Sequence, residues 1–250
     1  MKAEIEHYAQ QDSPIHRWDA RWKLASLFAL ILTAAIVNHP LVAFYALLVS
    51  VALLALTRLP LSLIMRRLGV VHFFLIPCFI ILPFTASGDR IDIIGFSASW
   101  QGAVLALTLY LRAVAIVLIS IVLLYSTSMS LLLRAAERLR VPRVLVQVGL
   151  LTYRYIFTLA NELTNMRRAL ISRGFRSRLN GATYRTLANM VGITLIRSFE
   201  RTDRIYRAMQ CRGYRGSMHT LHRFAVQGAD VGKSAVCLTA AVLLLLIDRL

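Results

Sequence analysis

Long apolar runs separated by short polar segments dominate the chain. A helix that spans a bilayer needs about 20 mostly apolar residues. The first two runs are shorter than this and flank an Asn-His-Pro turn signal, so they predict a hairpin of two short spans. The third run contains two prolines, which predict kinks. The five runs cover residues 24–37, 41–56, 68–86, 102–125 and 231–247. This pattern predicts an all-α polytopic membrane protein with about five transmembrane helices.

The composition supports this prediction. Hydrophobic residues make up 58% of the 250 residues and charged residues 16%, with a mean hydropathy of +0.63. Soluble domains average roughly 45–50% apolar and about 25% charged residues, and disordered chains are more polar still. The three cysteines are too few for a disulfide scaffold. The composition therefore excludes the soluble, disordered and disulfide-rich classes.

Positive charge is concentrated in one segment. Residues 134–223 contain eighteen arginines and four acidic residues, out of 29 Lys+Arg and 12 Asp+Glu in the chain. Basic segments next to membrane spans are retained on the cytoplasmic side. A basic block also raises nucleic acid as a partner, but this one contains no zinc-finger, RRM or KH signature. We therefore expect a cytoplasmic segment and no nucleic acid partner.

The charge distribution also predicts a topology and a division into domains. The N-terminus, the 58–67 loop and the basic block are expected in the cytoplasm, and the 38–40 turn, the 87–101 loop and the C-terminus outside. The predicted domains are residues 1–128 (the N-terminal tail and four spans), 129–228 (the basic cytoplasmic domain) and 229–250 (the last span).

Arg112 lies inside the fourth apolar run. A charge at membrane depth is costly and is by default a candidate for function. No acidic residue lies inside any of the five runs. We therefore favour the interpretation that its guanidinium pairs with a backbone carbonyl or a polar neighbour within the bundle.

The basic block contains two long amphipathic stretches. One predicted helix begins at Pro142 and continues to Ser172, and a second runs from about Ala182 to Cys211. In both, apolar residues recur every three to four positions, which is the spacing of one helix face. At 1.5 Å per residue, the first helix is ~45 Å long. The block is therefore expected to hold two long amphipathic cytoplasmic helices.

The two predicted helices end in the same sequence pattern. Residues 168–177 match residues 207–216, with the shared form R-A-[LM]-x-x-R-G-[FY]-R-[SG]. A glycine suits the left-handed position that ends a helix, and the arginine before it faces the negative end of the helix dipole. Two ordinary helix ends are the alternative, but arginine and aromatic anchors are typical of binding hot spots, so the repeat favours docking of two equivalent partners. The candidate docking residues are Ser172, Arg173, Gly174, Cys211, Arg212 and Gly213, supported by Phe175 and Tyr214.

The sequence lacks the motifs of common enzymatic sites. It has no Walker A glycine loop, no HExxH motif, no paired CxxC and no cluster of carboxylates. His219 and His222 have the spacing of a metal pair but are interpreted as solvated. His72 suits a ligand or a buried hydrogen-bonding residue, and we favour the second interpretation. We therefore predict a non-catalytic protein with no metal site and no cofactor of its own.

These features together resemble the transmembrane coupling (T) component of energy-coupling-factor ABC importers, in its cobalt-transport, CbiQ-type branch. The family reads Ala-Arg-Gly at both helix ends, so Ser172 and Cys211 depart from its pattern but remain small. Ala20 stands where the family usually has proline. The resemblance is carried by Ser172-Arg173-Gly174, Cys211-Arg212-Gly213, His16-Arg17-Trp18-Asp19-Ala20-Arg21-Trp22-Lys23-Leu24 and Tyr153-Arg154-Tyr155.

The resemblance implies a role and a set of partners. The two Arg-Gly ends would dock into grooves of two cytoplasmic ABC ATPase subunits, which bind the ATP. A separate substrate-binding membrane subunit, with or without a small accessory membrane subunit, would capture cobalt, and the two long helices would be coupling helices that transmit ATPase motion to it. The chain would be a multi-pass protein of a bacterial inner membrane with a cytoplasmic N-terminus. The alternatives are nickel or a vitamin as cargo, or a membrane-anchored basic module that binds anionic lipid or RNA.

Overall fold

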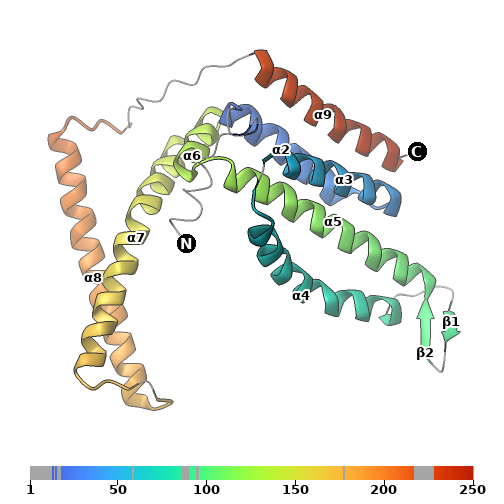
Figure 1. The fold of residues 1–250 in the computed structure, drawn as a ribbon. Coiled ribbons are helices and arrows are strands. Elements are labelled where there is room, and N and C mark those ends of the chain that lie inside the picture. The colour runs from blue at the N-terminus through green and yellow to red at the C-terminus, as the bar shows by residue number, and fades with distance from the viewer. Residues whose placement is uncertain are drawn as a thin grey trace. The chain divides into compact units, whose positions relative to one another are not determined.

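Helices make up nearly all of the described structure (Figure 1). The computed structural model describes residues 13, 15, 18–57, 59–85, 90–93, 96–176, 178–216 and 228–249. The elements are α2 (Ala20–Ile36), α3 (Pro40–Thr57), α4 (Leu61–Thr85), β1 (Arg90–Ile93), β2 (Phe96–Ser99), α5 (Trp100–Tyr125), α6 (Met129–Arg138), α7 (Arg143–Ser172), α8 (Gly181–Cys211) and α9 (Gly228–Arg249).

The chain divides into two compact units, residues 1–139 with 224–250 and residues 140–223. We call the first the membrane unit and the second, which holds α7 and α8, the hairpin unit. The charge pattern groups α6 with the basic domain that is expected from residue 129. In the structure α6 belongs to the membrane unit, because its Leu132 is buried in the same cluster as Leu27 and Leu30 of α2.

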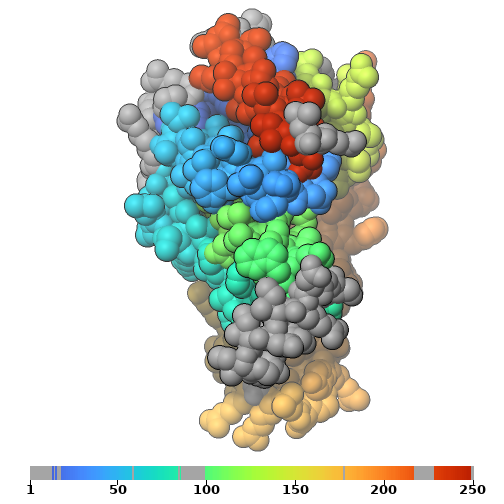
Figure 2. Space-filling view, turned by 90° about the vertical axis from the view of Figure 1, so that its right-hand side faces the viewer, coloured from blue at the N-terminus to red at the C-terminus, as the bar shows by residue number. Residues whose placement is uncertain are grey.

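α5 is the central helix of the membrane unit. It packs against α2, α3 and α4, while α9 packs against α2 and α3. Leu27 of α2 and Ile119 and Val122 of α5 are completely buried in the core that these helices form. Large apolar side chains cover the outer surface of α3 and α9, which lie side by side in Figure 2, for example Leu41 and Val236. Such a surface is suited to contact with lipid.

Four helices, α3, α4, α5 and α9, are long and apolar enough to cross a membrane. α2 contains the first predicted run and has 17 residues, which is the lower end of the range for a span. α2 and α3 follow one another where the short hairpin was predicted, but they pack against α5 and α9 rather than against each other. α4 continues as one helix through Pro77 and Pro83, and its ribbon bends in Figure 1. The prediction of an all-α polytopic membrane protein is confirmed.

Polar contacts fix the beginning of α2. Asp19 caps the helix by accepting a hydrogen bond from a backbone N–H of the first turn, so α2 begins at Ala20 without a proline there. Lys23 is completely buried, and its Nζ donates to the Ser126 carbonyl (3.2 Å) and to Thr127 Oγ1 (2.8 Å). These acceptors compensate the burial of the ammonium group. They also tie the start of α2 to the end of α5.

Arg112 reaches from α5 to the end of α2. Its Nη1 donates to the carbonyl oxygens of Ala35 (3.0 Å) and Val37 (3.4 Å). The last carbonyls of a helix have no intrahelical donor, so the guanidinium supplies a missing partner. The interpretation that Arg112 pairs with a backbone carbonyl or a polar neighbour is confirmed, and the partners are carbonyls.

Replacing Arg112 with methionine is expected to destabilise the membrane unit. The variant leaves these carbonyls without their donor, which costs about 1–3 kcal/mol for a group shielded from water. Thermal unfolding of the detergent-solubilised protein should show a lower Tm for Arg112→Met, and a smaller decrease for Arg112→Lys, which keeps a donor. An unchanged Tm in Arg112→Met would show that the two hydrogen bonds contribute no stability.

Two further features concern the turn after α2 and the segment before α5. The Asp248 carboxylate accepts hydrogen bonds from the N–H groups of Asn38 (3.0 Å) and His39 (2.9 Å), so the end of α9 lies beside the 38–40 turn, as the predicted topology requires. β1 and β2 form an antiparallel hairpin in a segment where the sequence analysis expected only a loop. Ser99, the last residue of β2, then caps α5 by accepting from the Gly102 N–H.

The hairpin unit consists of α7 and α8, joined by residues 173–180 (Figure 1). The predicted bounds of both helices agree with the structure to within one residue. Pro142 precedes the first residue of α7. Asn180 caps α8, because its side-chain oxygen accepts from the Ala182 N–H at 2.8 Å.

Candidate docking site

The end of α7 is closed by a Schellman motif. Phe175 N–H donates to the Leu170 carbonyl (3.0 Å), and Gly174 N–H donates to the Ile171 carbonyl (2.9 Å). Gly174 has φ 79°, in the left-handed region that favours glycine. Arg173, just before it, has φ −88° and ψ 15°.

The end of α8 repeats this backbone. Tyr214 N–H donates to the Met209 carbonyl (3.0 Å), and Gly213 N–H donates to the Gln210 carbonyl (3.0 Å). Gly213 has φ 80°, and Arg212 has φ −89° and ψ 14°. A Cβ on this glycine would meet no atom within 4 Å, so the backbone conformation, and not space, calls for glycine. The repeat in the sequence is therefore also a repeat of structure.

The arginines of the two helix ends are presented to solvent. Arg173 and Arg212 are exposed, whereas Phe175 and Tyr214 are half-buried. Among the described residues, neither arginine side chain forms a hydrogen bond or an ion pair. Each end thus offers an unpaired guanidinium next to an aromatic residue, which is the chemistry of a binding hot spot.

Ser172 and Cys211, the residues before the two arginines, are both exposed. Ser172 Oγ donates to the Arg168 carbonyl (3.1 Å) within its own helix. Cys211 is a free thiol. Both side chains are small, so they leave the neighbouring arginine accessible to a partner.

The two ends are well separated along the hairpin. The first lies in the connection that precedes α8, and the second lies at the far end of α8. α8 has 31 residues, which corresponds to ~46 Å. This separation suits two partner molecules, each bound at its own end.

Ion pairs engage every acidic residue of the described hairpin. Glu162 of α7 pairs across the hairpin with Arg197 (3.5 Å) and Arg201 (3.1 Å) of α8. Glu200 and Asp203 pair with arginines one turn further along α8. The other arginines leave a positive surface, which suits a partner that presents carboxylates or carbonyl groups.

The hairpin also exposes large apolar side chains, including Val144, Leu195 and Phe199. Phe199 has 78% of its surface exposed. Large exposed apolar patches mark contact surfaces in folded proteins. The two helices therefore offer apolar contact area in addition to their arginine ends.

Nothing in the described part of the chain assembles a metal centre. No three His, Cys, Asp or Glu residues there lie close enough to hold an ion. His219 and His222 lie outside the described residues. His72 Nδ1 donates to the Leu68 carbonyl, and its Nε2 accepts from the Tyr110 hydroxyl, which confirms its interpretation as a hydrogen-bonding residue.

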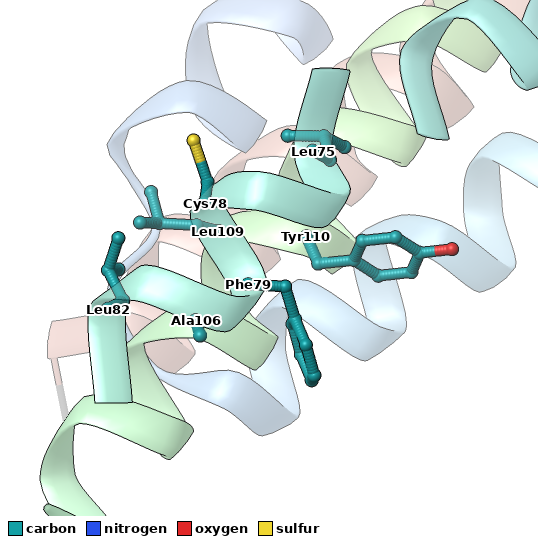
Figure 3. A pocket seen from close by; sticks show the side chains of 7 residues that line it. All are labelled: Leu75, Cys78, Phe79, Leu82, Ala106, Leu109 and Tyr110. Carbon is teal, nitrogen blue, oxygen red and sulfur yellow. The ribbon is translucent and has the colours of Figure 1, made fainter. Parts of the chain in front are cut away.

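An apolar pocket lies between α4 and α5 (Figure 3). The hydroxyl of its Tyr110 is engaged with His72, outside the pocket lining. The pocket therefore offers apolar walls with little polar chemistry. It is lined by Leu75, Cys78, Phe79, Leu82, Ala106, Leu109 and Tyr110.

Comparison with known proteins identifies the family. The family model for CbiQ, described as "Cobalt transport protein", matches residues 11–222. The chain belongs to the CbiQ family. It is 32% identical to the cobalt transport protein CbiQ of Rhodobacter capsulatus, over 70% of this chain and 71% of that protein. It is 29% identical to the energy-coupling factor transporter transmembrane protein EcfT of Acidaminococcus fermentans (96% and 94% covered) and 27% identical to that of Bacillus subtilis (85% and 84% covered).

This CbiQ-family protein is thus a transmembrane (T) component of the energy-coupling-factor class, of the cobalt-transport type. The resemblance drawn from the two helix ends is confirmed at the level of the family. The protein is a membrane subunit of a transporter, as the apolar helices of the membrane unit also indicate.

Two polar residues of this CbiQ-family chain escaped the sequence analysis. Glu162 joins the two helices by ion pairs. Gln147 of α7 bonds to Tyr214 and Gly216, which lie 67 and 69 residues further along the chain. A single polar residue in an amphipathic helix has no local signal that indicates such a distant partner.

Proposed function

We propose that this protein is the coupling subunit of an ATP-driven importer for cobalt ions. Two cytoplasmic ABC ATPase subunits dock at its helix ends, one at Ser172-Arg173-Gly174 and one at Cys211-Arg212-Gly213. The observation that carries the proposal is the Schellman motif with an exposed arginine that closes α7 and is repeated at the end of α8. A repeated site of identical backbone fits two copies of one partner.

The proposed mechanism is mechanical. ATP binds to the ATPase subunits, not to this chain, and changes their separation. The two docking ends move with the ATPases, and α7 and α8 carry the displacement because they are long helices linked by the Glu162 ion pairs. The chain supplies no catalytic residue and binds no cofactor of its own.

The displacement is passed to a separate substrate-binding membrane subunit, with or without a small accessory membrane subunit. The exposed apolar side chains of α7 and α8 supply contact area for such a subunit. That subunit, and not this chain, captures the cobalt ion. The family description and the cobalt transport relative from Rhodobacter capsulatus support cobalt as cargo.

The orientation follows from charge. The arginine-rich hairpin faces the cytoplasm, where the ATPases are, and the N-terminus lies on the same side. The membrane is the inner membrane of a bacterial cell, and lipid covers the apolar outer surface of the membrane unit.

Reconstitution of the complex in lipid vesicles tests the proposal. Vesicles that contain this chain, the ATPases and the substrate-binding subunit should accumulate radioactive cobalt when ATP is present on the ATPase side. Vesicles without this chain should not. Cobalt uptake that persists without this chain contradicts the coupling role, whereas ATP-driven uptake of nickel but not cobalt contradicts only the cargo.

A further inference from the structure

A pair of hydrogen bonds closes the open end of the hairpin. The Tyr214 hydroxyl donates to Gln147 Oε1 (2.7 Å), and Gln147 Nε2 donates to the Gly216 carbonyl (2.8 Å). A carbonyl can only accept, so the Nε2 amide group of Gln147 must face Gly216, and its Oε1 therefore faces the Tyr214 hydroxyl. Gln147 lies near the start of α7, and its two partners follow the end of α8. We call this contact the Gln147 latch.

Backbone geometry supports the latch. Gly213 and Gly216 both have φ 80°, so two left-handed residues bracket Tyr214. Residues with a side chain rarely adopt this conformation. The two glycines let the chain turn directly after α8 and bring the tyrosine hydroxyl and the Gly216 carbonyl to one glutamine.

The latch affects the two docking ends unequally. The first end lies in the connection between α7 and α8, so the chain joins it to both helices. The second end follows α8 alone, so its position relative to α7 depends on non-covalent contacts. Phe175, the counterpart of Tyr214 at the first end, has no hydroxyl and cannot form the same hydrogen bond.

Among the described residues, three ties therefore join the helices into a closed frame. They are the connection of residues 173–180, the ion pairs of Glu162 with Arg197 and Arg201, and the Gln147 latch. Loss of the latch removes two hydrogen bonds that tie the end of α8 to the start of α7. With the latch in place, a displacement of the second docking end reaches both helices.

We propose that Gln147 is a positioning residue for the second docking end, where it holds Tyr214 and the neighbouring Arg212 in place against α7 as a preformed site for an ATPase subunit. This inference rests on the proposed function. It makes the two ATPase sites chemically distinct: the first is held by the chain itself, and the second by a glutamine–tyrosine hydrogen bond.

Titration of a fluorescent ATPase subunit onto the full-length chain in lipid nanodiscs tests the latch. Arg173→Ala leaves only the second site, and Arg212→Ala leaves only the first. Tyr214→Phe or Gln147→Leu is added to each background. Tyr206→Phe, which removes an exposed hydroxyl from α8, is the matched control. Gel filtration of each variant checks that the chain remains folded.

In the Arg173→Ala background, Tyr214→Phe and Gln147→Leu should each weaken ATPase binding about two- to tenfold, as expected for the loss of a hydrogen bond. The variant that carries both substitutions should bind the ATPase no more weakly than Gln147→Leu alone, because both substitutions remove the same contact. In the Arg212→Ala background neither should change the affinity. Tyr206→Phe should have no effect in either background.

Two results overturn the inference in different ways. Unchanged affinity of the second site in Tyr214→Phe and Gln147→Leu, or equal weakening of both sites, contradicts the latch and leaves the docking function intact. Full ATPase binding in both Arg212→Ala and Arg173→Ala contradicts docking at the helix ends, and with it the proposed role of the latch.

Discussion

The double variant Arg173→Ala/Arg212→Ala is expected to lose the ATPase subunits. Each guanidinium is exposed and unpaired among the described residues. Each arginine is the C-cap of its helix, so the Schellman motif fixes its backbone. Removal of an arginine at such a hot spot costs about 2 kcal/mol or more, which is about 30-fold in affinity per site. Titration of the ATPase onto nanodisc-embedded protein measures this loss, and the single variants should each lose one site.

Arg154 and Arg185 provide a control of equal charge. Both are exposed arginines of the hairpin, and neither belongs to a docking end. Arg154→Ala/Arg185→Ala also removes two positive charges but leaves both docking ends intact, so it should bind the ATPases nearly as well as the wild type. If both double variants lost affinity equally, and binding fell steeply with salt, general electrostatic attraction to the basic block would explain the association instead.

Replacement of Glu162 with alanine is expected to uncouple ATP hydrolysis from transport. Its carboxylate joins α7 to α8 through two arginines and is the acidic residue of the described α7. Loss of this link leaves Arg197 and Arg201 without their partner, so the middle of α7 is no longer tied to α8 by an ion pair. Mutations along a coupling path change the coupling free energy by about 0.5–2 kcal/mol in known cases. The cobalt transported per ATP hydrolysed should therefore fall about 2- to 30-fold.

The Glu162→Ala variant should still bind both ATPases, because its docking ends are intact. Glu200→Ala is the matched control, since it also removes a carboxylate and an ion pair (Glu200–Arg204, 3.9 Å) but one that lies within α8. It should transport as efficiently as the wild type. A normal ratio of transport to hydrolysis in Glu162→Ala would mean that the cross-helix ion pairs have no part in coupling.

Local patterns predicted the membrane helices and the ends of α7 and α8, but not α6 and not the start of α4 at Leu61, where a loop over 58–67 was expected. Continuous apolar runs predicted the spans because a membrane helix needs one, and the two Arg-Gly pairs predicted the helix ends because glycine adopts the left-handed position. The pairing of Arg112 with carbonyls was predictable because no acidic residue lies within an apolar run.

Contacts between distant segments were not predictable. Lys23 is buried against Ser126 and Thr127, about a hundred residues away, and nothing near it in the sequence indicates this. Gln147 likewise bonds to Tyr214 only because the end of α8 lies beside the start of α7 in the folded hairpin. The hairpin of β1 and β2 was missed because its strands have four residues each, which is too short for a clear alternating pattern.

The mass of the intact complex shows directly whether the two helix ends bind the ATPase subunits. Native mass spectrometry of this chain, purified with its ATPases and the substrate-binding subunit, counts the ATPase copies on each coupling chain. We expect two copies in the wild type, fewer in Arg173→Ala and in Arg212→Ala, and none in the double variant. Two ATPase copies on the double variant would contradict docking at the helix ends.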